Sequence, residues 1–194
     1  GGRGIGAETA VKAAKAGWDV CVNYQGNAAR AEAVVADVIA AGQRGIAAQA
    51  DISLEADVVR LFETCDAELG QVTGLVNSAG ILEPLARVDE LDGDGLVRHM
   101  MINVVGSILC AREAVRRMST AHGGKGGVIV NLSSRTSDLG GAGASVHYGA
   151  SKGAINSFTF GLAQEVSAEG VRVCAVSPGV IDTEIQPPGR VEAV

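Results

Sequence analysis

The sequence lacks the features that mark membrane-spanning and nucleic-acid-binding proteins. It has no run of about 18 apolar residues, so no membrane-spanning helix is expected. Its formal charge is −6, and its 16 Lys and Arg are scattered among 22 Asp and Glu. No basic stripe is therefore present that could neutralise a phosphate backbone. Neither nucleic acid nor membrane is an expected partner.

Cysteine and histidine are also scarce, and neither type is clustered. Cys21, Cys65, Cys110 and Cys174 form no CxxC pair, and the three histidines are too isolated to complete a zinc site with them. Isolated thiols within apolar runs are typical of core residues. We therefore expect core thiols, no metal and a reducing, cytoplasmic location.

What the chain does contain is a regular alternation of apolar patterns. With 194 residues, 47% of them apolar and 20% charged, it can form one domain with a sizeable core. Short apolar runs alternate with longer segments of helical spacing, which is typical of a parallel sheet covered by helices on both faces. We predict the α/β class and a single domain over residues 1–194.

The expected elements follow from this pattern. Strands are expected at residues 19–24, 46–51, 74–77, 128–132 and 171–176. Helices are expected near residues 6–16, 28–41, 54–69, 95–118 and 148–168. Several of these helices end at a glycine, which is a common helix stop. The predicted architecture has three layers around a doubly wound parallel sheet.

The two ends of this pattern look incomplete. The glycine-rich start, residues 1–6, has the composition of a phosphate loop, yet no strand precedes it. In a doubly wound sheet that first strand lies in the middle. The other end, residues 187–194, is a loop with no closing helix or strand. We expect the natural protein to extend at both ends, with its first and C-terminal strands absent from this chain.

The glycine-rich start is the first candidate binding element. Arg3, Gly4, Ile5 and Gly6 lead directly into a predicted helix. Small residues at this place let backbone amides and the helix dipole approach a pyrophosphate. Glycines near a chain start can equally be flexible, so this segment alone leaves both interpretations open.

Tyr148 and Lys152 form the second candidate pair. A spacing of four residues places the phenol and the ammonium on one face of a helix. A nearby cation stabilises a phenolate and lowers the pKa of a tyrosine from its usual value of about 10, which suits proton exchange with an alcohol or carbonyl oxygen. The alternative is a pair on a helix surface without a catalytic role.

Polar residues close to these elements add further candidates. Ser133 and Ser134 end a buried strand, at the edge where open α/β sheets bind ligands. Ser134 can donate to a substrate oxygen or serve as a turn residue. Asn103 lies in an apolar helix, where a buried amide either bonds local backbone or holds an ordered water. His147 either lines a pocket or lies in a solvated loop.

Other candidates follow the strands at the same predicted edge of the sheet. They are Asp51 and Ile52 after the second predicted strand, Asn77, Ala79 and Gly80 after the third, and Pro178, Gly179, Ile181 and Thr183 after the last. Small residues there let a ligand lie against the backbone. Asp51 can instead cap the next helix with Ser53, and turn chemistry alone explains the Pro-Gly segment.

In this order and spacing the motifs resemble the classical short-chain dehydrogenase/reductase family, specifically its bacterial 3-oxoacyl-carrier-protein-reductase-like and glucose-dehydrogenase-like members. The likeness covers essentially the whole chain. It implies a Rossmann-type fold and hydride transfer between a nicotinamide cofactor and a secondary alcohol or ketone. It also implies a homo-oligomer, either a tetramer or a dimer. The identity of the substrate stays open.

The resemblance also implies roles for the candidate residues. Tyr148 is expected to be the general acid/base, Lys152 to lower its pKa and hold the nicotinamide ribose, Ser134 to polarise the substrate oxygen, and Asn103 to hold a relay water. Three groups of residues are expected at the cofactor. Thr183 and Ile181, with Pro178 and Gly179 before them, are expected at the carboxamide. Asn77, Ala79 and Gly80 are expected at the ribose, and Asp51 and Ile52 at the adenine.

The chain departs from the family pattern at the serine. The family's serine usually lies one position closer to the tyrosine than Ser134 does, and this chain has Arg135 there. Arginine cannot replace a neutral hydroxyl donor. We therefore assign the role to Ser134, infer a one-residue insertion within residues 135–147, and keep Ser133 as the alternative.

The strand predicted at residues 19–24 bears on the choice of cofactor. NAD-specific relatives place an acid at its end to bind the ribose diol, whereas this chain has Asn23 and Tyr24 followed by Gln25. No carboxylate repels a 2′-phosphate there, and Arg3 can pair with one. We expect a preference for NADP(H), with NAD(H) as the alternative.

A non-catalytic NAD(P)-binding sensor and an epimerase or dehydratase of the same family are the competing functions.

Overall fold

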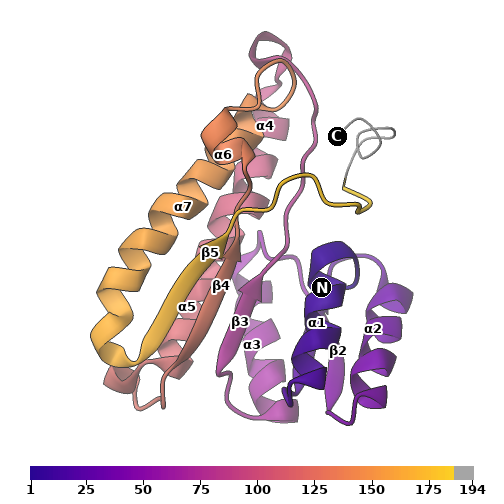
Figure 1. Cartoon of the computed structure of the whole chain (residues 1–194), viewed down its shortest axis with the longest axis vertical. Coiled ribbons are helices and arrows are strands. Elements are labelled where there is room, and N and C mark those ends of the chain that lie inside the picture. The colour runs from indigo at the N-terminus through magenta and orange to yellow at the C-terminus, as the bar shows by residue number, and fades with distance from the viewer. Residues whose placement is uncertain (186–194) are drawn as a thin grey trace. The chain divides into compact units, whose positions relative to one another are not determined.

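The computed structural model describes residues 1–185, which form two compact units (Figure 1). Unit 1 comprises Gly1–Val72 and the segment that begins at Asp182, and unit 2 comprises Thr73–Ile181. The loop predicted at residues 187–194 lies outside the described residues. The single domain predicted over residues 1–194 stays a prediction.

Unit 1 is a two-stranded parallel sheet packed with three helices. Its strands are β1 (Val20–Tyr24) and β2 (Gly45–Gln49), and its helices are α1 (Gly4–Lys15), α2 (Ala28–Ala40) and α3 (Glu55–Leu69). Val20 pairs with Gly45 at the start of the sheet. The side chain of Asn27 caps α2 by accepting from the amide of Arg30 at 3.0 Å.

Small residues set how closely the helices of unit 1 approach its sheet. A Cβ atom at Gly45 would lie 3.0 Å from the Val38 side chain, and one at Gly2 would lie 3.1 Å from the Ala31 amide nitrogen. Ala31 belongs to a buried cluster with Val22 and Val34. The apolar face of α2 and the glycines beside it therefore fix the positions of β2 and of the glycine-rich loop.

Unit 2 is a three-stranded parallel sheet in the order β3, β4, β5 (Figure 1). The strands are β3 (Gly74–Asn77), β4 (Gly127–Leu132) and β5 (Val171–Val176), and the α-helices are α4 (Gly93–Met100), α5 (Gly106–Met118), α6 (Thr136–Leu139) and α7 (Val146–Val166). A π-helical segment, η2 (Met101–Val105), joins α4 to α5. Helix α5 contacts β3 and β4, and α7 contacts β4 and β5.

Three short 3₁₀ turns complete unit 2: η1 (Val88–Glu90), η3 (Thr120–His122) and η4 (Ser167–Glu169). The Ser119 side chain accepts from the Ala121 amide at 3.1 Å and so caps η3. Gly170, which follows η4, has a φ of +77°, a conformation that favours glycine. It turns the chain from α7 into β5.

A buried polar network ties the helices of unit 2 to its central strand. Asn131 on β4 is fully buried; its Oδ1 accepts from Asn77 Nδ2 at 2.9 Å, and its Nδ2 donates to Thr159 Oγ1 at 2.9 Å. Asn77 Nδ2 also donates to the Ser107 carbonyl oxygen at 3.0 Å. Because buried amides need partners, this network fixes α5 and α7 against the ends of β3 and β4.

The predicted α/β class and parallel strand pairing are confirmed, and the strand positions agree to within two residues. The continuous helix predicted over residues 95–118 is wrong. It begins at Gly93 and is interrupted by the π-helical segment η2, in which Asn103 lies. A single wider turn hardly changes the spacing of apolar residues, so the pattern does not reveal it.

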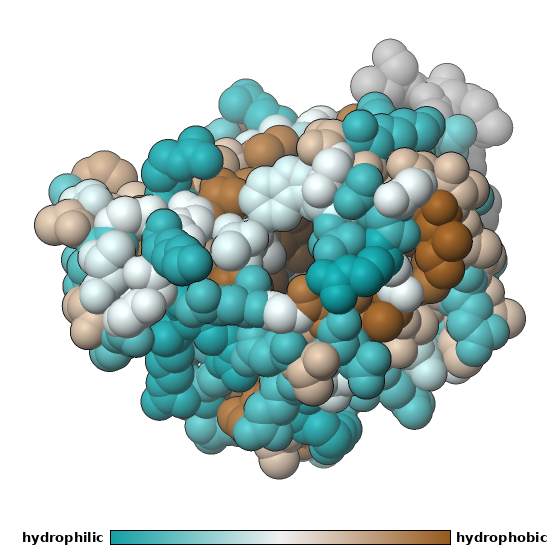
Figure 2. Space-filling view, turned by 90° about the horizontal axis from the view of Figure 1, so that it is seen from below, coloured by the Kyte–Doolittle hydropathy of each residue, from teal (hydrophilic) through white to brown (hydrophobic). Residues whose placement is uncertain are grey.

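The surface carries polar and apolar residues side by side. On the face in Figure 2, hydrophilic and hydrophobic residues are interspersed. In the part of the chain that the structure describes, no helix combines the length and the apolar character needed to cross a lipid bilayer.

Candidate active site

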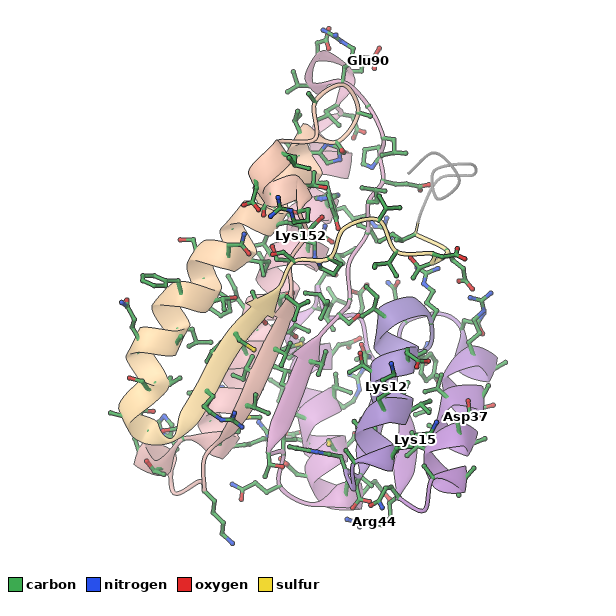
Figure 3. All side chains as sticks on the ribbon, in the orientation of Figure 1. Lys12, Lys15, Asp37, Arg44, Glu90 and Lys152 are labelled. Carbon is green, nitrogen blue, oxygen red and sulfur yellow. The ribbon has the colours of Figure 1, made fainter. Side chains whose placement is uncertain are left out.

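Tyr148 and Lys152 lie on α7 and face the carboxyl end of β4. Figure 3 shows Lys152 near the carboxyl ends of β4 and β5. Its Nζ lies 5.7 Å from the centroid of the Tyr148 ring and donates to the Leu132 carbonyl oxygen at 2.7 Å. The four-residue spacing therefore brings the two groups together. Lys152 is 5% exposed, and burial lowers its pKa to about 8.

The environment of the Tyr148 phenol differs from the predicted one. Burial raises the pKa of Tyr148 above its usual value of 10.0, and a hydrogen bond with Ser134 offsets part of that rise. A lowered pKa was expected from the Lys152 ammonium, and this expectation is wrong for the structure. The ammonium is bonded to the Leu132 carbonyl, and removal of the phenol from water dominates. The phenol is therefore protonated at neutral pH, as a proton donor must be.

The two adjacent serines have different partners. Ser133 is buried, and its Oγ donates to the carbonyl oxygen of Lys152 at 3.1 Å, so it serves the backbone of α7. Ser134 Oγ accepts from the amide of Thr136 at 3.1 Å and donates to Thr136 Oγ1 at 3.1 Å, and it lies close enough to the Tyr148 phenol to lower its pKa by hydrogen bonding. The structure thus places Ser134 beside the phenol. The Arg135 guanidinium bonds Asp138 at 3.2 Å instead.

Asn103 holds a backbone segment near Lys152. Its Nδ2 donates to the carbonyl oxygen of Ile81 at 2.8 Å, and its Oδ1 accepts from the amide of Ile81 at 2.8 Å. A Cβ atom on the preceding residue, Gly80, would lie 3.3 Å from Asn103 Oδ1 and 3.6 Å from Lys152 Nζ. Of the two predicted uses of this amide, the structure shows the backbone one. The relay water stays a prediction.

In unit 1, the N-terminus of α1 fits a phosphate group. Arg3 at the N-cap makes no side-chain capping bond, and the first turn contains no acidic residue. Gly4 has a φ of +52°, which favours glycine, and a Cβ there would lie 3.2 Å from the Thr183 side chain. The first amides of this helix, including those of Ile5 and Gly6, therefore lack a side-chain cap and can face an anion.

Two arginines near this helix converge on one carboxylate. Arg3 Nη1 lies 3.9 Å from Glu184 Oε2, and Arg30 Nη1 forms an ion pair with the same oxygen. Two guanidinium groups around one anion form the arrangement that binds phosphate monoesters. Arg30 was missed by the sequence analysis. Its position in the first turn of α2, the helix that follows the strand predicted at residues 19–24, was the available signal.

The other candidates in unit 1 are engaged in holding the fold. Asn23 Nδ2 donates to the carbonyl oxygens of Ala48 and Ala50 at 3.2 and 3.1 Å. Asp51 Oδ1 accepts from the Ser53 amide at 2.9 Å and from its hydroxyl at 2.6 Å, which closes a local turn. The alternative in which Asp51 caps the next helix is wrong, because the N-cap of α3 is Leu54 and it makes no side-chain capping bond. Burial acts to raise the pKa of Asp51, but hydrogen bonds from Ser53 outweigh it and leave the pKa lowered.

The remaining candidates occupy positions that also follow from packing. Tyr24 packs against the buried cluster of unit 1, and Ile52 is buried. In unit 2, the carbonyl oxygen of Pro178 accepts from the Arg135 amide at 3.0 Å, which ties the segment after β5 to the end of β4. The cofactor-binding roles of Asn77, Ala79, Gly179, Ile181 and Thr183 stay predictions.

Two histidines lie near Tyr148: His147, which the sequence analysis considered, and His99, which it missed. His99 on α4 is fully buried, and its ring centroid is 6.1 Å from that of Tyr148 and 4.7 Å from that of His147. His147 is 4% exposed, so the solvated-loop alternative is wrong. Among residues 1–185, neither ring nitrogen of His147 has a hydrogen-bond partner.

The described residues contain no group of three potential metal ligands.

Comparison with known proteins identifies relatives over nearly the whole chain. The model of the family described as short chain dehydrogenase matches residues 1–192. The chain is 46% identical over 198 residues to the uncharacterized oxidoreductase YgfF of Escherichia coli (strain K12), covering 100% of this chain and 80% of that protein. It is 35% identical over 185 residues to a 3-oxoacyl-[acyl-carrier-protein] reductase of Synechocystis sp., covering 94% and 72%.

Solved structures show the same architecture. A short chain dehydrogenase from Burkholderia cenocepacia J2315 in complex with NADP is 34% identical, with a TM-score of 0.90, and the match covers 100% of this chain and 76% of that one. A dehydrogenase/reductase from Sinorhizobium meliloti 1021 is 32% identical, with a TM-score of 0.92 and coverage of 100% and 75%. The predicted Rossmann-type fold is confirmed by these matches.

Proposed function

The chain belongs to the short-chain dehydrogenase family, and we propose that this oxidoreductase transfers hydride between NADP(H) and a secondary alcohol or its ketone. The observation that carries the proposal is a half-buried, protonated phenol with one hydroxyl donor and one buried amine beside it: Tyr148, Ser134 and Lys152. When bound, the nicotinamide cofactor supplies or accepts the hydride.

Tyr148 handles the proton of the reaction. In the reductive direction its phenol donates a proton to the carbonyl oxygen of the substrate, and in the oxidative direction the phenolate accepts one from the alcohol. Because burial raises the pKa of Tyr148, the phenol carries its proton and is uncharged at neutral pH. Ser134 donates a hydrogen bond to the same substrate oxygen and stabilises charge that develops on it.

Lys152 supports the phenol and holds the cofactor ribose. An ammonium has three N–H donors, and the Leu132 carbonyl takes one of them. No other acceptor for Lys152 is found in residues 1–185, so the remaining donors suit the hydroxyl groups of a ribose. With a pKa of about 8 the amine is mostly cationic at neutral pH, and its charge lies 5.7 Å from the centroid of the Tyr148 ring.

The preference for NADP(H) over NAD(H) rests on unit 1. Arg3 and Arg30 bring two guanidinium groups to one anion, and the ends of β1 and β2 carry no acid other than Asp51, whose carboxylate is occupied by Ser53 and Gln25. A 2′-phosphate would compete with Glu184 for the two arginines. The NADP complex of the Burkholderia relative supports this choice.

The further roles implied by the family belong to the same proposal. Asn103 is assigned to a proton-relay water, and the residues after β3 and β5 are assigned to the ribose and carboxamide of the cofactor. We also propose a cytoplasmic homo-oligomer, a tetramer or a dimer. Sedimentation of the purified protein tests this, and a monomer at micromolar concentration would contradict it.

The experiment that tests the function follows the absorbance of NADPH and NADH with a panel of carbonyl compounds. The panel contains a 3-oxoacyl thioester, a keto sugar, a steroid ketone and small cyclic and aliphatic ketones, because the structure does not single out one of them. We expect substrate-dependent oxidation of NADPH with at least one member and a lower KM for NADPH than for NADH. Binding of NADPH without turnover of any member would contradict the proposal.

A further inference from the structure

His99 is a fully buried histidine with a partner at each ring nitrogen. Its Nδ1 lies 3.1 Å from the carbonyl oxygen of Glu83, and its Nε2 lies 2.9 Å from Asn103 Nδ2. A carbonyl oxygen only accepts, so Nδ1 must carry the hydrogen, and Nε2 then presents a lone pair to the amide of Asn103. The contacts therefore specify one neutral tautomer.

This tautomer determines how the side chain of Asn103 is oriented. Its two Nδ2 hydrogens are taken by His99 Nε2 and by the carbonyl oxygen of Ile81, and its Oδ1 accepts the Ile81 amide. The opposite orientation of the amide would place Oδ1 against two acceptors. The Ser151 hydroxyl oxygen is a second, longer acceptor for Asn103 Nδ2, at 3.3 Å against 2.9 Å for His99 Nε2, and its own hydrogen goes to the Tyr148 carbonyl oxygen at 2.8 Å.

We propose that His99 is a positioning residue that, through Asn103, holds the backbone of Gly80 and Ile81 beside Lys152. The proposal rests on the proposed function for its kinetic consequences, but the contacts themselves are independent of it. Gly80 lies close to the Lys152 amine, since a Cβ atom at Gly80 would be 3.6 Å from Nζ. A shift of this segment therefore changes the surroundings of the amine. His99 acts only through Asn103 and touches no reacting atom.

Protonation of His99 breaks this arrangement. A hydrogen on Nε2 would face the N–H of Asn103 at 2.9 Å, so two donors would oppose each other, and the proton would have to turn to the Ser151 hydroxyl oxygen, 3.3 Å from Nε2. The charged or titratable groups that face His99 are His147 at a ring distance of 4.7 Å, Tyr148 at 6.1 Å, and Lys152. Burial lowers the pKa of His99 below its usual 6.5, and the charges of His147 and Lys152 act in the same direction. The residue is therefore neutral at physiological pH.

Two substitutions separate positioning from packing. In His99→Gln the side-chain amide can still accept from Asn103 but cannot be ionised. In His99→Leu both ring nitrogens are removed at similar side-chain volume, which leaves Asn103 Nδ2 and the Glu83 carbonyl oxygen without His99 as a partner. Because the pKa of His99 is lowered, we expect the kcat of the wild type to fall only at pH values more acid than the usual histidine pKa of 6.5. His99→Gln should retain activity without this acid limb, and His99→Leu should lose about tenfold or more in kcat with a smaller change in KM. His122→Leu, at an exposed histidine, is the matched control.

A second readout does not depend on turnover. The Ile81 amide donates to Asn103 Oδ1, so its hydrogen exchange should become about tenfold or more faster in His99→Leu than in the wild type, and stay slow in His99→Gln and His122→Leu. Unchanged Ile81 exchange in His99→Leu, or an acid limb retained in His99→Gln, overturns the positioning role. If the wild type reduces no carbonyl compound, the proposed function fails, while the exchange comparison still decides the role of His99.

Discussion

Replacement of Ser134 by alanine tests which of two adjacent hydroxyl groups takes part in proton transfer. Ser134→Ala removes a hydrogen bond to the Tyr148 phenol, whereas Ser133→Ala removes a bond to the Lys152 carbonyl oxygen at 3.1 Å. The two variants delete the same atom from neighbouring residues. Ser133→Ala is therefore a matched control for Ser134→Ala.

The structure gives different magnitudes for the two variants. A donor that meets charge developing on a substrate oxygen contributes about 10²–10³ in kcat, so we expect a loss of this size in Ser134→Ala. The pKa of Tyr148 should also rise further, because the hydrogen bond with Ser134 acts to lower it. Ser133→Ala should lose about 1 kcal/mol of stability and keep kcat within a few fold, because its bond is structural.

The assay combines steady-state kinetics with urea unfolding. We would measure kcat and KM with NADPH and the best carbonyl substrate for both variants, and the free energy of unfolding for each. Wild-type kcat in Ser134→Ala would refute the assignment. A large loss in Ser133→Ala alone would transfer the role to that residue.

Three further predictions concern the cofactor, the core and the buried amine. Arg30→Ala should raise KM for NADPH about tenfold or more and leave KM for NADH nearly unchanged, because a guanidinium–phosphate pair is lost, while Arg60→Ala at an exposed site should change neither. Thr159→Val should lower the free energy of unfolding by about 1–3 kcal/mol, because Asn131 Nδ2 loses its acceptor, and Thr159→Ser, which keeps the hydroxyl, should cost less in urea unfolding. The pKa of Lys152 falls from 10.5 to about 8 on folding, so the unfolded chain binds this proton more tightly than the folded chain does. The free energy of unfolding should therefore rise between pH 8 and 10.5, and the urea midpoint of Lys152→Met should rise less over this range than that of the wild type.

Local spacing was enough to predict which residues gather at the site. The four-residue interval between Tyr148 and Lys152 has one geometric outcome on a helix, and two apolar strands that end in Asn77 and Ser134 bring polar groups to one edge of a parallel sheet. These features depend on the period of a helix or strand, which is the same in every protein.

Depth of burial and exact partners could not be predicted in this way. The direction of the pKa shift of Tyr148 depends on how several elements pack around the phenol, because a nearby cation lowers this pKa and loss of contact with water raises it. The spacing of residues within α7 does not determine which effect is larger. The same holds for Arg30, which meets Glu184 across 154 positions of sequence. The π-helical turn at Asn103 depends on the partner that this amide finds at Ile81, in a different segment.

The central claim, that the half-buried phenol of Tyr148 transfers the proton, is tested most directly by Tyr148→Phe. The change removes one oxygen and leaves the ring, so NADPH binding, measured by fluorescence titration, should stay within a few fold of the wild type. Turnover of the best carbonyl substrate should fall by about 10²–10⁴, the usual contribution of a positioned acid. Turnover close to that of the wild type in Tyr148→Phe would contradict the account.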